Sequence, residues 1–341
     1  MNVVAMLTFR VKWLSALDYK KLGLVADYIG YDKDAGLNVY RLNPAKAASI
    51  GLDRTIEILG KLGVYLPENV KEKIGELEGE NVDTLLVSEG SDLVVYSANR
   101  RLRRVLEERG IAVWDSRSGT LRAKPMMLHE IIGCAGKAGS RIKLEFTVNY
   151  ALTYNPILKL ELRKYQREAF EKWVEAGFRG IIVLPTGAGK TLVGLKCIEY
   201  LKVKTLILVP TIELLNQWRD KIVSTLNPPP NTIGVYGGGR REIREITIMT
   251  YDSASINLWK YSTYFGLIIA DECHHAVSPS YMRALEESTA PYRLGLTATP
   301  FRSDGLHKNY EKIIGGIVYT LSHVELQEEG YLAKHVEKKI Y

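Results

Sequence analysis

The stretch GIIVLPTGAGKTLVGL, residues 180–195, decides the fold of the second half of the chain. It opens with an apolar run that ends at Leu184, turns through two glycines and continues as a helical pattern from Leu192. A strand, a glycine-rich loop and a helix in this order form an anion site, because main-chain N–H groups and the positive end of the helix dipole point at the ligand. The sequence therefore predicts a phosphate-binding loop formed by Thr186, Gly187, Ala188, Gly189, Lys190 and Thr191.

Two residues of this loop have distinct expected roles. Lys190 is expected to reach the β- and γ-phosphates of a bound nucleotide, and Thr191 is expected to reach Mg²⁺. The strict pattern G-x-x-x-x-G-K-[ST] is not met, because Leu184 stands where its first glycine would be. The variant P-T-G-x-G-K-T, common in helicases, fits residues 185–191.

A pair of carboxylates follows a second apolar run, residues 266–270. Asp271 at the end of this run is expected to hold Mg²⁺, and Glu272 is expected to orient or deprotonate the attacking water. Cys273, His274 and His275 come next. Adjacent side chains rarely converge on one metal ion, so we expect His274 to act in a relay rather than as a zinc ligand.

Short apolar runs alternate with helical segments throughout this half of the chain. The predicted strands are residues 180–184, 205–209, 233–236, 246–249, 266–270 and 293–296. This alternation predicts a doubly wound α/β domain with a parallel sheet, which binds its ligands at the carboxyl ends of the strands.

The preceding residues predict one or two smaller α/β domains. The polar segment Gly75–Asn81 contains two glycines, so a domain joint is expected there. The expected division is 1–79, 80–150 and 160–341, with a linker before the last.

Composition narrows the class of protein. The formal charge is +7 and 46% of the residues are apolar, which fits a globular protein with a polyanionic partner. The three cysteines lie far apart, so we expect neither a disulfide framework nor a C-x-x-C metal site. We expect instead a reducing compartment, the cytoplasm, or the nucleus if the source is a eukaryote. No apolar run is long enough to cross a membrane. Glutamine occurs only three times, which favours a thermophilic source.

An arginine-rich helix is predicted over residues 99–109. Its leucines and valine share one side, so its arginines are expected to face solvent, either as a solvated charged face or as a phosphate-binding patch. The arginines expected to contact nucleic acid are Arg100, Arg101, Arg103 and Arg104 on this helix, with Arg117 and Arg122 on the following hairpin.

Several motifs resemble those of superfamily-two helicases. The stretch LRKYQ at 162–166 resembles the adenine-reading Q motif, and DECH at 271–274 is a DExH box. Val209-Pro210-Thr211 resembles motif Ia, residues 250–253 resemble motif Ib, and LTATP at 296–300 resembles motif III. The resemblance implies the following roles: Arg163 and Gln166 for adenine; Pro210, Thr211, Thr250 and Tyr251 for DNA; Thr297 and Thr299 for coupling hydrolysis to DNA; and His274 for a relay between motor lobes.

Within that superfamily the chain resembles the archaeal XPB-type DNA repair helicases. The supporting stretches are RLGLTAT at 293–299, TYDSA at 250–254 and DSRSGTLRA at 115–123. The last resembles part of the damage-recognition domain that precedes the XPB motor. Three scattered cysteines exclude the iron–sulfur pattern of the companion helicase XPD.

The chain departs from the XPB pattern in two places. Where the family has Arg-Glu-Asp after motif III, and uses it on DNA, this sequence has Arg302-Ser303-Asp304. No Q-x-x-G-R-x-x-R sequence is present, so the second motor lobe is expected to be missing from these residues. Residues 1–79 resemble no family that we identify.

The expected protein is thus an ATP- and Mg²⁺-dependent DNA helicase or translocase of nucleotide excision repair. Its expected partners are single-stranded or junction DNA, a second motor lobe and a repair nuclease. The alternatives are the translocating subunit of a restriction enzyme, an RNA helicase, and a DNA-binding adapter that does not hydrolyse ATP.

Overall fold

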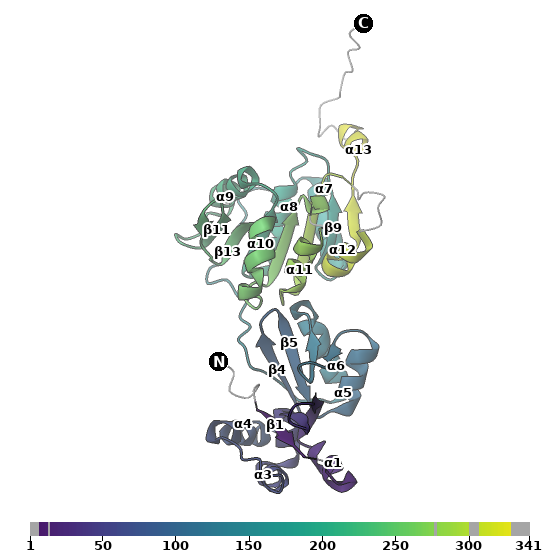
Figure 1. Ribbon diagram of the computed structural model, residues 1–341. Coiled ribbons are helices and arrows are strands. Elements are labelled where there is room, and N and C mark those ends of the chain that lie inside the picture. Colours follow the sequence, from purple (N-terminus) through teal and green to yellow (C-terminus); the bar gives the residue numbers. More distant parts are fainter. Residues whose placement is uncertain (1–6, 13, 276–277, 300–306, 329–341) are drawn as a thin grey trace. The chain divides into compact units, whose positions relative to one another are not determined.

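The structure is a computed structural model that describes residues 7–12, 14–275, 278–299 and 307–328 of the 341-residue chain. The chain divides into two compact units, Met1–Thr147 and Val148–Tyr341, each described here by itself (Figure 1). Among the described residues, no helix has the length and apolar character needed to cross a membrane.

The second unit is built on an eight-stranded sheet with the strand order β12-β11-β13-β10-β14-β15-β9-β16. Its strands are β9 (Arg179–Val183), β10 (Thr205–Val209), β11 (Ile233–Gly237), β12 (Arg240–Arg241), β13 (Ile246–Thr250), β14 (Leu267–Asp271), β15 (Tyr292–Thr297) and β16 (Ile317–Thr320). All neighbouring strands are parallel except β12, which pairs antiparallel with β11. The predicted parallel α/β sheet is confirmed, and all six predicted strands are present.

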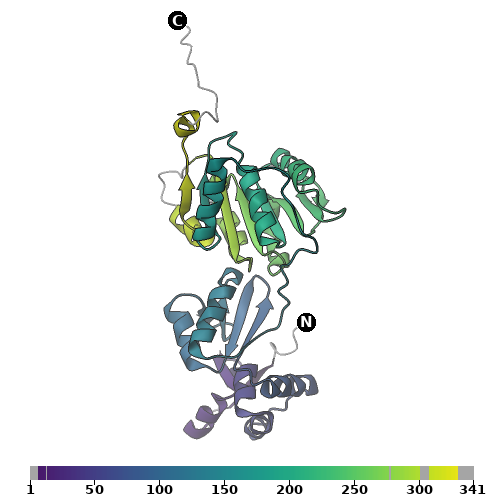
Figure 2. The same ribbon diagram turned by 180° about the vertical axis from the view of Figure 1, so that it is seen from behind.

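Helices cover both faces of this sheet (Figures 1 and 2). They are α7 (Lys164–Glu175), α8 (Lys190–Leu201), α9 (Ile212–Leu226), α10 (Tyr251–Asn257), α11 (Pro279–Glu286), α12 (His307–Ile314) and α13 (His323–Glu328), with 3-10 turns at Leu258–Tyr261 and Cys273–His275. α7, α8 and α9 pack in series, as do α10, α11 and α12. Because both faces are covered, the central strands are mainly apolar, and every residue of β10 and of β14 is buried.

The strand order brings distant sequence motifs to one edge of the sheet. β15 lies between β9 and β14, so the loop after β9 and the carboxylates at the end of β14 are separated by a single strand. β10, β13 and β11 follow on the other side of β14. The carboxyl ends of these parallel strands therefore carry the phosphate loop, the acidic pair and the starts of α9 and α10.

The first unit contains two sheets. β1 (Thr8–Val11), β3 (Leu37–Leu42) and β2 (Ala26–Asp32) form a three-stranded antiparallel sheet in that order. The second sheet has the order β6-β7-β5-β4-β8, with strands β4 (Thr84–Glu89), β5 (Asp92–Ser97), β6 (Val113–Asp115), β7 (Thr120–Ala123) and β8 (Ile142–Leu144). The helices are α1 (Ala16–Leu22), α2 (Pro44–Ile50), α3 (Leu52–Gly60), α4 (Glu68–Gly79), α5 (Arg100–Glu108) and α6 (Leu128–Ala138), with a 3-10 turn at Pro125–Met127.

The predicted joint at Gly75–Asn81 is not a boundary between compact units. Most of the segment belongs to α4, whose Ile74 and Leu77 are fully buried. One hydrophobic core joins side chains from both sides of the expected joint, among them Tyr40 and Val94. The polar composition of the segment reflects the exposed face of an amphipathic helix.

Candidate nucleotide-binding site

The phosphate loop has the predicted backbone. Gly187 and Gly189 have φ values of +81° and +78°, in the left-handed region that favours glycine. α8 begins at Lys190, directly after the second of these glycines. A side chain at position 189 would place its Cβ 2.5 Å from Nε2 of Gln166, so this position also lacks space for any other residue.

Gln166 fastens this loop to the start of α7. Its buried side chain donates from Nε2 to the carbonyl of Ala188 at 2.8 Å and accepts at Oε1 from the main-chain N–H of Arg163 at 2.9 Å. The hydroxyl of Tyr165 donates to the same Ala188 carbonyl at 2.8 Å and lies 3.4 Å from Nη1 of Arg163. An amide group offers two N–H donors and two acceptor lone pairs, and these two contacts use one of each on Gln166.

Lys190 and Glu272 lie within ion-pair distance of each other. Nζ of Lys190 is 3.5 Å from Oε1 of Glu272 and 3.4 Å from the carbonyl oxygen of Leu184. Lys190 is almost fully buried, whereas Glu272 is partly exposed. The structure thus brings together the lysine and the carboxylate that the sequence assigned to the phosphates and to the attacking water.

Asp271 is buried and held from three directions. Trp218 donates from Nε1 to its Oδ2 at 2.7 Å, and the main-chain N–H of Glu272 donates to its Oδ1 at 3.0 Å. Tyr251 donates from its hydroxyl to the Asp271 carbonyl at 2.9 Å. Burial raises the pKa of the Asp271 carboxyl above its usual value, and the hydrogen bond from Trp218 opposes that rise.

The residues beyond Asp271 turn sharply toward motif III. Glu272 has φ +46°, a left-handed conformation that is strained for a residue with a side chain. Nδ1 of His274 lies 2.9 Å from Oγ1 of Thr297 and 3.5 Å from Oε2 of Glu272. Oγ1 of Thr297 also bonds to both the carbonyl and the N–H of Thr299, at 3.2 and 3.3 Å. The predicted relay and coupling residues are therefore in direct contact.

The donor set fits Mg²⁺ rather than a softer metal. Mg²⁺ prefers oxygen ligands and takes one or two carboxylates, the remaining positions going to phosphate oxygens and water. Asp271 supplies a carboxylate at the strand end, and Thr191 supplies a hydroxyl in the first turn of α8. The described residues contain no cluster of three or more histidine, cysteine or acidic side chains that could hold a metal ion by itself.

A groove lies at the carboxyl ends of β10 and β13. Its lining residues are Pro210, Thr211, Ile212, Glu213, Gly238, Thr250, Asp252 and Ser253. Thr211 caps α9 by accepting from the N–H of Leu214, and Thr250 caps α10 by accepting from the N–H of Ser253. The groove therefore joins the N-terminal ends of α9 and α10, where motifs Ia and Ib lie, to the glycine-rich loop after β11.

Comparisons with known proteins agree with this arrangement. The family model described as "Type III restriction enzyme, res subunit" matches residues 159–302. The DNA 3'-5' translocase XPB2 of Sulfurisphaera tokodaii is 48% identical over 183 residues, 54% of this chain and 40% of that protein. This part of the chain is thus similar to a protein named as an XPB-type translocase. A putative DNA 3'-5' helicase Rad25 of Haloarcula marismortui is 39% identical over 180 residues, which cover 52% of this chain and 28% of that relative.

The chain is also similar to a solved structure, the helicase domain of Pyrococcus furiosus Hef. The identity is 24% and the TM-score 0.46, over 52% of this chain and 42% of the other. The chain thus covers less than half the length of each relative named here.

The side chain of Tyr251 does not line the groove, contrary to the predicted DNA contact. Its side chain is buried, and its hydroxyl donates a hydrogen bond to the Asp271 carbonyl. Thr250 is also largely buried, although it lines the groove. The motif placed the first turn of α10 correctly, but the direction of the tyrosine ring follows from packing under β14.

Two of the six arginines predicted to contact DNA form ion pairs within the first unit. Arg103 pairs with Asp27 at 3.3 Å and lies over the ring of Trp114, while Arg122 lies 2.9–3.5 Å from Glu89, Asp92 and Asp115. These contacts hold both guanidinium groups against acidic side chains of the first unit, and their role on DNA stays a prediction. Those that remain exposed are Arg100, Arg101, Arg104 and Arg117, of which Arg104 pairs with Glu108 in the next turn. Arg302 and Asp304 lie outside the described residues.

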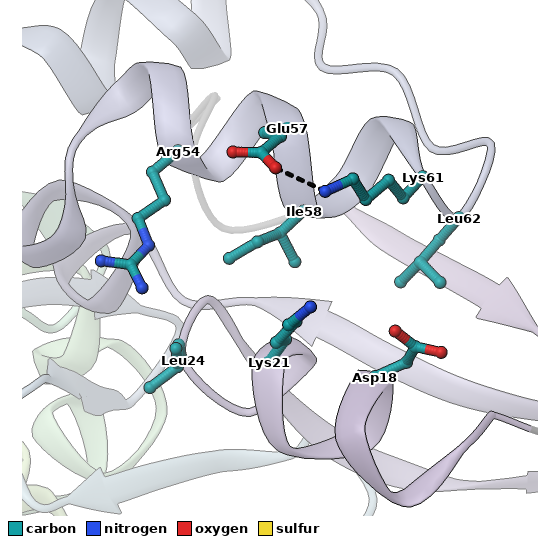
Figure 3. A pocket seen from close by; sticks show the side chains of 8 residues that line it. All are labelled: Asp18, Lys21, Leu24, Arg54, Glu57, Ile58, Lys61 and Leu62. Atoms are coloured by element: carbon teal, nitrogen blue, oxygen red, sulfur yellow. Dashed lines mark hydrogen bonds and ion pairs between the residues drawn. The ribbon is translucent and has the colours of Figure 1, made fainter.

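A second hollow lies in the first unit, between α1 and α3 (Figure 3). Arg54, Glu57 and Lys61 line it from α3, with Ile58 as part of its apolar floor. Glu57 accepts a hydrogen bond from Lys61, which lowers the pKa of Glu57 below its usual value. None of the predicted site residues lines this hollow, and it plays no part in the nucleotide chemistry.

Sequence reasoning missed the role of Trp218. Its side chain is almost fully buried. No sequence pattern predicts the hydrogen bond from its indole N–H to Asp271, because this contact joins α9 to the end of β14.

Proposed function

We propose that this chain is the ATP-binding part of an XPB-type DNA translocase that acts in nucleotide excision repair. The observation that carries the proposal is the meeting of Lys190 with Glu272, next to Asp271, at the carboxyl edge of a parallel sheet. A cation, a metal-binding carboxylate and a water-binding carboxylate at one edge are the groups that phosphoryl transfer to water requires.

The chain's own residues divide the work as follows. The main-chain N–H groups of the loop and the ammonium of Lys190 hold the phosphates of ATP. Thr191 and Asp271 would hold Mg²⁺, which supplies positive charge against the β- and γ-phosphate oxygens. Glu272 orients the attacking water and accepts its proton. His274 and Thr297 link this carboxylate to motif III.

The groove supplies the DNA contact of the proposed motor. The first N–H groups of α9 and α10 are not used within their helices and bear partial positive charge. Each start is preceded by a capping threonine that leaves the remaining N–H groups open to a phosphate. Such contacts bind the DNA backbone without reading its sequence, as a translocase requires.

A second motor lobe is the first partner that this chemistry requires. In motors of this kind the negative charge of the transition state is stabilised by arginines from a facing lobe, and residues 1–341 contain no Q-x-x-G-R-x-x-R sequence. A repair nuclease is the second partner that we propose. This proposal rests on the analogy with nucleotide excision repair and on no contact made by residues of this chain.

A restriction-enzyme translocase is the main rival, and the description of the matching family model names one. The named relatives at 48% and 39% identity carry helicase and translocase names instead. An RNA helicase and a non-hydrolysing adapter are the remaining rivals.

A competition experiment separates these alternatives. A labelled DNA duplex bound to the chain is displaced by unlabelled DNA or by RNA of the same sequence, with and without a non-hydrolysable MgATP analogue. We expect DNA to compete better than RNA, and the analogue to change the affinity for DNA. Equal competition by RNA supports the RNA helicase, and an affinity that is indifferent to the analogue supports the adapter.

A further inference from the structure

Two aromatic side chains donate hydrogen bonds to the same residue, Asp271. They come from α9 and α10, the two helices that begin at the groove. Trp218 of α9 donates to its carboxylate, and Tyr251 of α10 donates to its main-chain carbonyl. Both donors are almost fully buried, so water does not compete for either contact. The residue assigned to the metal ion is therefore held by the same two helices whose N-termini line the groove.

α9 forms a rigid connection from the groove to the carboxylate. Thr211 caps its N-terminus at the groove, and Trp218 lies about two turns further along, or roughly 10 Å at 1.5 Å per residue. The far edge of the indole ring fills the space over Gly194 of α8, where an added Cβ would come within 2.8 Å of it. The ring is thus confined between the phosphate-loop helix and the end of β14, and a shift of α9 must move its N–H relative to Asp271.

α10 forms a second, shorter connection. Tyr251 is its first residue and directly follows the capping Thr250. Its ring stacks on Tyr281 with 5.3 Å between centroids, and the hydroxyl of Tyr281 donates to Asp252, which lines the groove. A ligand that contacts Asp252 therefore acts, through Tyr281, on the ring that holds the Asp271 carbonyl.

We propose that Trp218 and Tyr251 are positioning residues that couple occupancy of the groove to the metal-binding carboxylate. This inference rests on the proposed function, in which the groove takes DNA and Asp271 takes Mg²⁺. Neither side chain touches a ligand; each sets where the carboxylate stands. By linkage, the factor by which DNA changes the affinity for MgATP equals the factor by which MgATP changes the affinity for DNA.

The test measures this coupling factor as the ratio of DNA affinities with and without a saturating non-hydrolysable MgATP analogue. The variants are Trp218→Phe, which removes the indole N–H, and Tyr251→Phe, which removes only a hydroxyl. Trp173→Phe is a matched control, since Trp173 is equally buried in the same unit and donates from Nε1 to the Arg293 carbonyl at 3.0 Å. Tyr150→Phe is the second control, removing a hydroxyl that donates to Thr289.

We expect a coupling factor in the range of about 5–150 for the unaltered chain, and a fall toward 1 in Trp218→Phe and Tyr251→Phe. DNA affinity without nucleotide should stay unchanged in both, because neither side chain lines the groove. When Mg²⁺ is titrated at a fixed nucleotide concentration, nucleotide binding should depend less on Mg²⁺ in the same two variants. Both controls should keep the coupling factor of the unaltered chain.

Two results would overturn the proposal. Coupling that survives in both variants means that Asp271 is positioned by other contacts, and coupling that falls equally in Trp173→Phe means that any loosened core abolishes it. If Trp218→Phe fails to fold, Tyr251→Phe decides the matter, since it leaves the ring in place. A chain that binds neither DNA nor MgATP refutes the proposed function itself, whereas intact binding with insensitive coupling refutes only this inference.

Discussion

The ammonium of Lys190 lies 3.5 Å from a carboxylate oxygen of Glu272, although the two residues follow different strands. Lys190 begins the helix after β9, and Glu272 follows the last residue of β14, with β15 between the two strands. A phosphate held by the loop would therefore lie within reach of both the lysine and the carboxylate. This juxtaposition is the basis of the assigned chemistry.

Glu272→Gln should separate nucleotide binding from hydrolysis. The amide keeps the shape of the side chain but can neither accept the proton of the attacking water nor pair as an anion with Lys190. We expect MgATP to bind at least as tightly as before, and turnover in the complete motor to fall by about 10²–10⁴, the usual contribution of a general base. Glu175→Gln, on the exposed end of α7, serves as the control. Turnover that survives Glu272→Gln would assign the water to another group.

Gly189→Ala should distort the phosphate loop. The position has φ +78°, and the added methyl group would meet the amide nitrogen of Gln166 at 2.5 Å. We expect a loss of about 1–3 kcal/mol in the free energy of unfolding, together with a loss of nucleotide affinity. Gly133→Ala, in the exposed middle of α6 with nothing within 4 Å of the new Cβ, should instead add about 0.4–1 kcal/mol. Chemical denaturation of both variants provides the comparison.

Arg117→Ala and Arg122→Ala should differ in kind. Arg117 is exposed, so its loss should weaken DNA binding, lower the slope of log affinity against log salt by about 0.9, and leave folding unchanged. Arg122 lies within ion-pair distance of three carboxylates of the first unit, so its loss should cost about 1–3 kcal/mol of stability. Salt titrations and denaturation curves on the two variants distinguish the roles. Equal stability losses would contradict the assignment of Arg122 as structural.

A polypeptide of residues 1–341 should bind DNA but hydrolyse ATP very slowly, with or without DNA. The groove and the exposed arginines lie within these residues, whereas the arginines of a second lobe do not. A transition-state arginine contributes about 10³–10⁵ in rate where it has been measured in GTPases. Phosphate release by this polypeptide provides the test. DNA-stimulated turnover at helicase rates would mean that another group supplies the missing charge.

The fold of the second unit was predictable from sequence because its strands are buried on both faces. Runs such as residues 205–209 are mainly apolar and end at turns, so their bounds were found to within a residue or two. β16 was missed because it is short and lies at the sheet edge, where none of its four residues is buried. In the first unit, the last part of α4 was mistaken for a joint because its exposed face is rich in glutamate and glycine.

The nucleotide site was predictable where chain neighbours carry the chemistry. The loop and the acidic pair are contiguous motifs, and strand order alone brings them together. The contacts of four side chains were not predicted, because their partners are distant in sequence. These are Trp218 and Tyr251 with Asp271, Arg103 with Asp27, and Arg122 with the carboxylates around it. A local sequence pattern does not predict which distant residue a long side chain contacts.

The most direct test of the nucleotide site is a calorimetric titration of the chain with a non-hydrolysable MgATP analogue, set beside Lys190→Ala and Lys196→Ala. Both lysines lie on α8, but Lys196 pairs with Glu199 away from the loop. We predict one Mg²⁺-dependent site in the unaltered chain and in Lys196→Ala. In Lys190→Ala the affinity should fall by about 10- to 100-fold, the contribution of a hydrogen bond to a charged group. Equal affinities in the two variants would contradict the assignment of the phosphate loop.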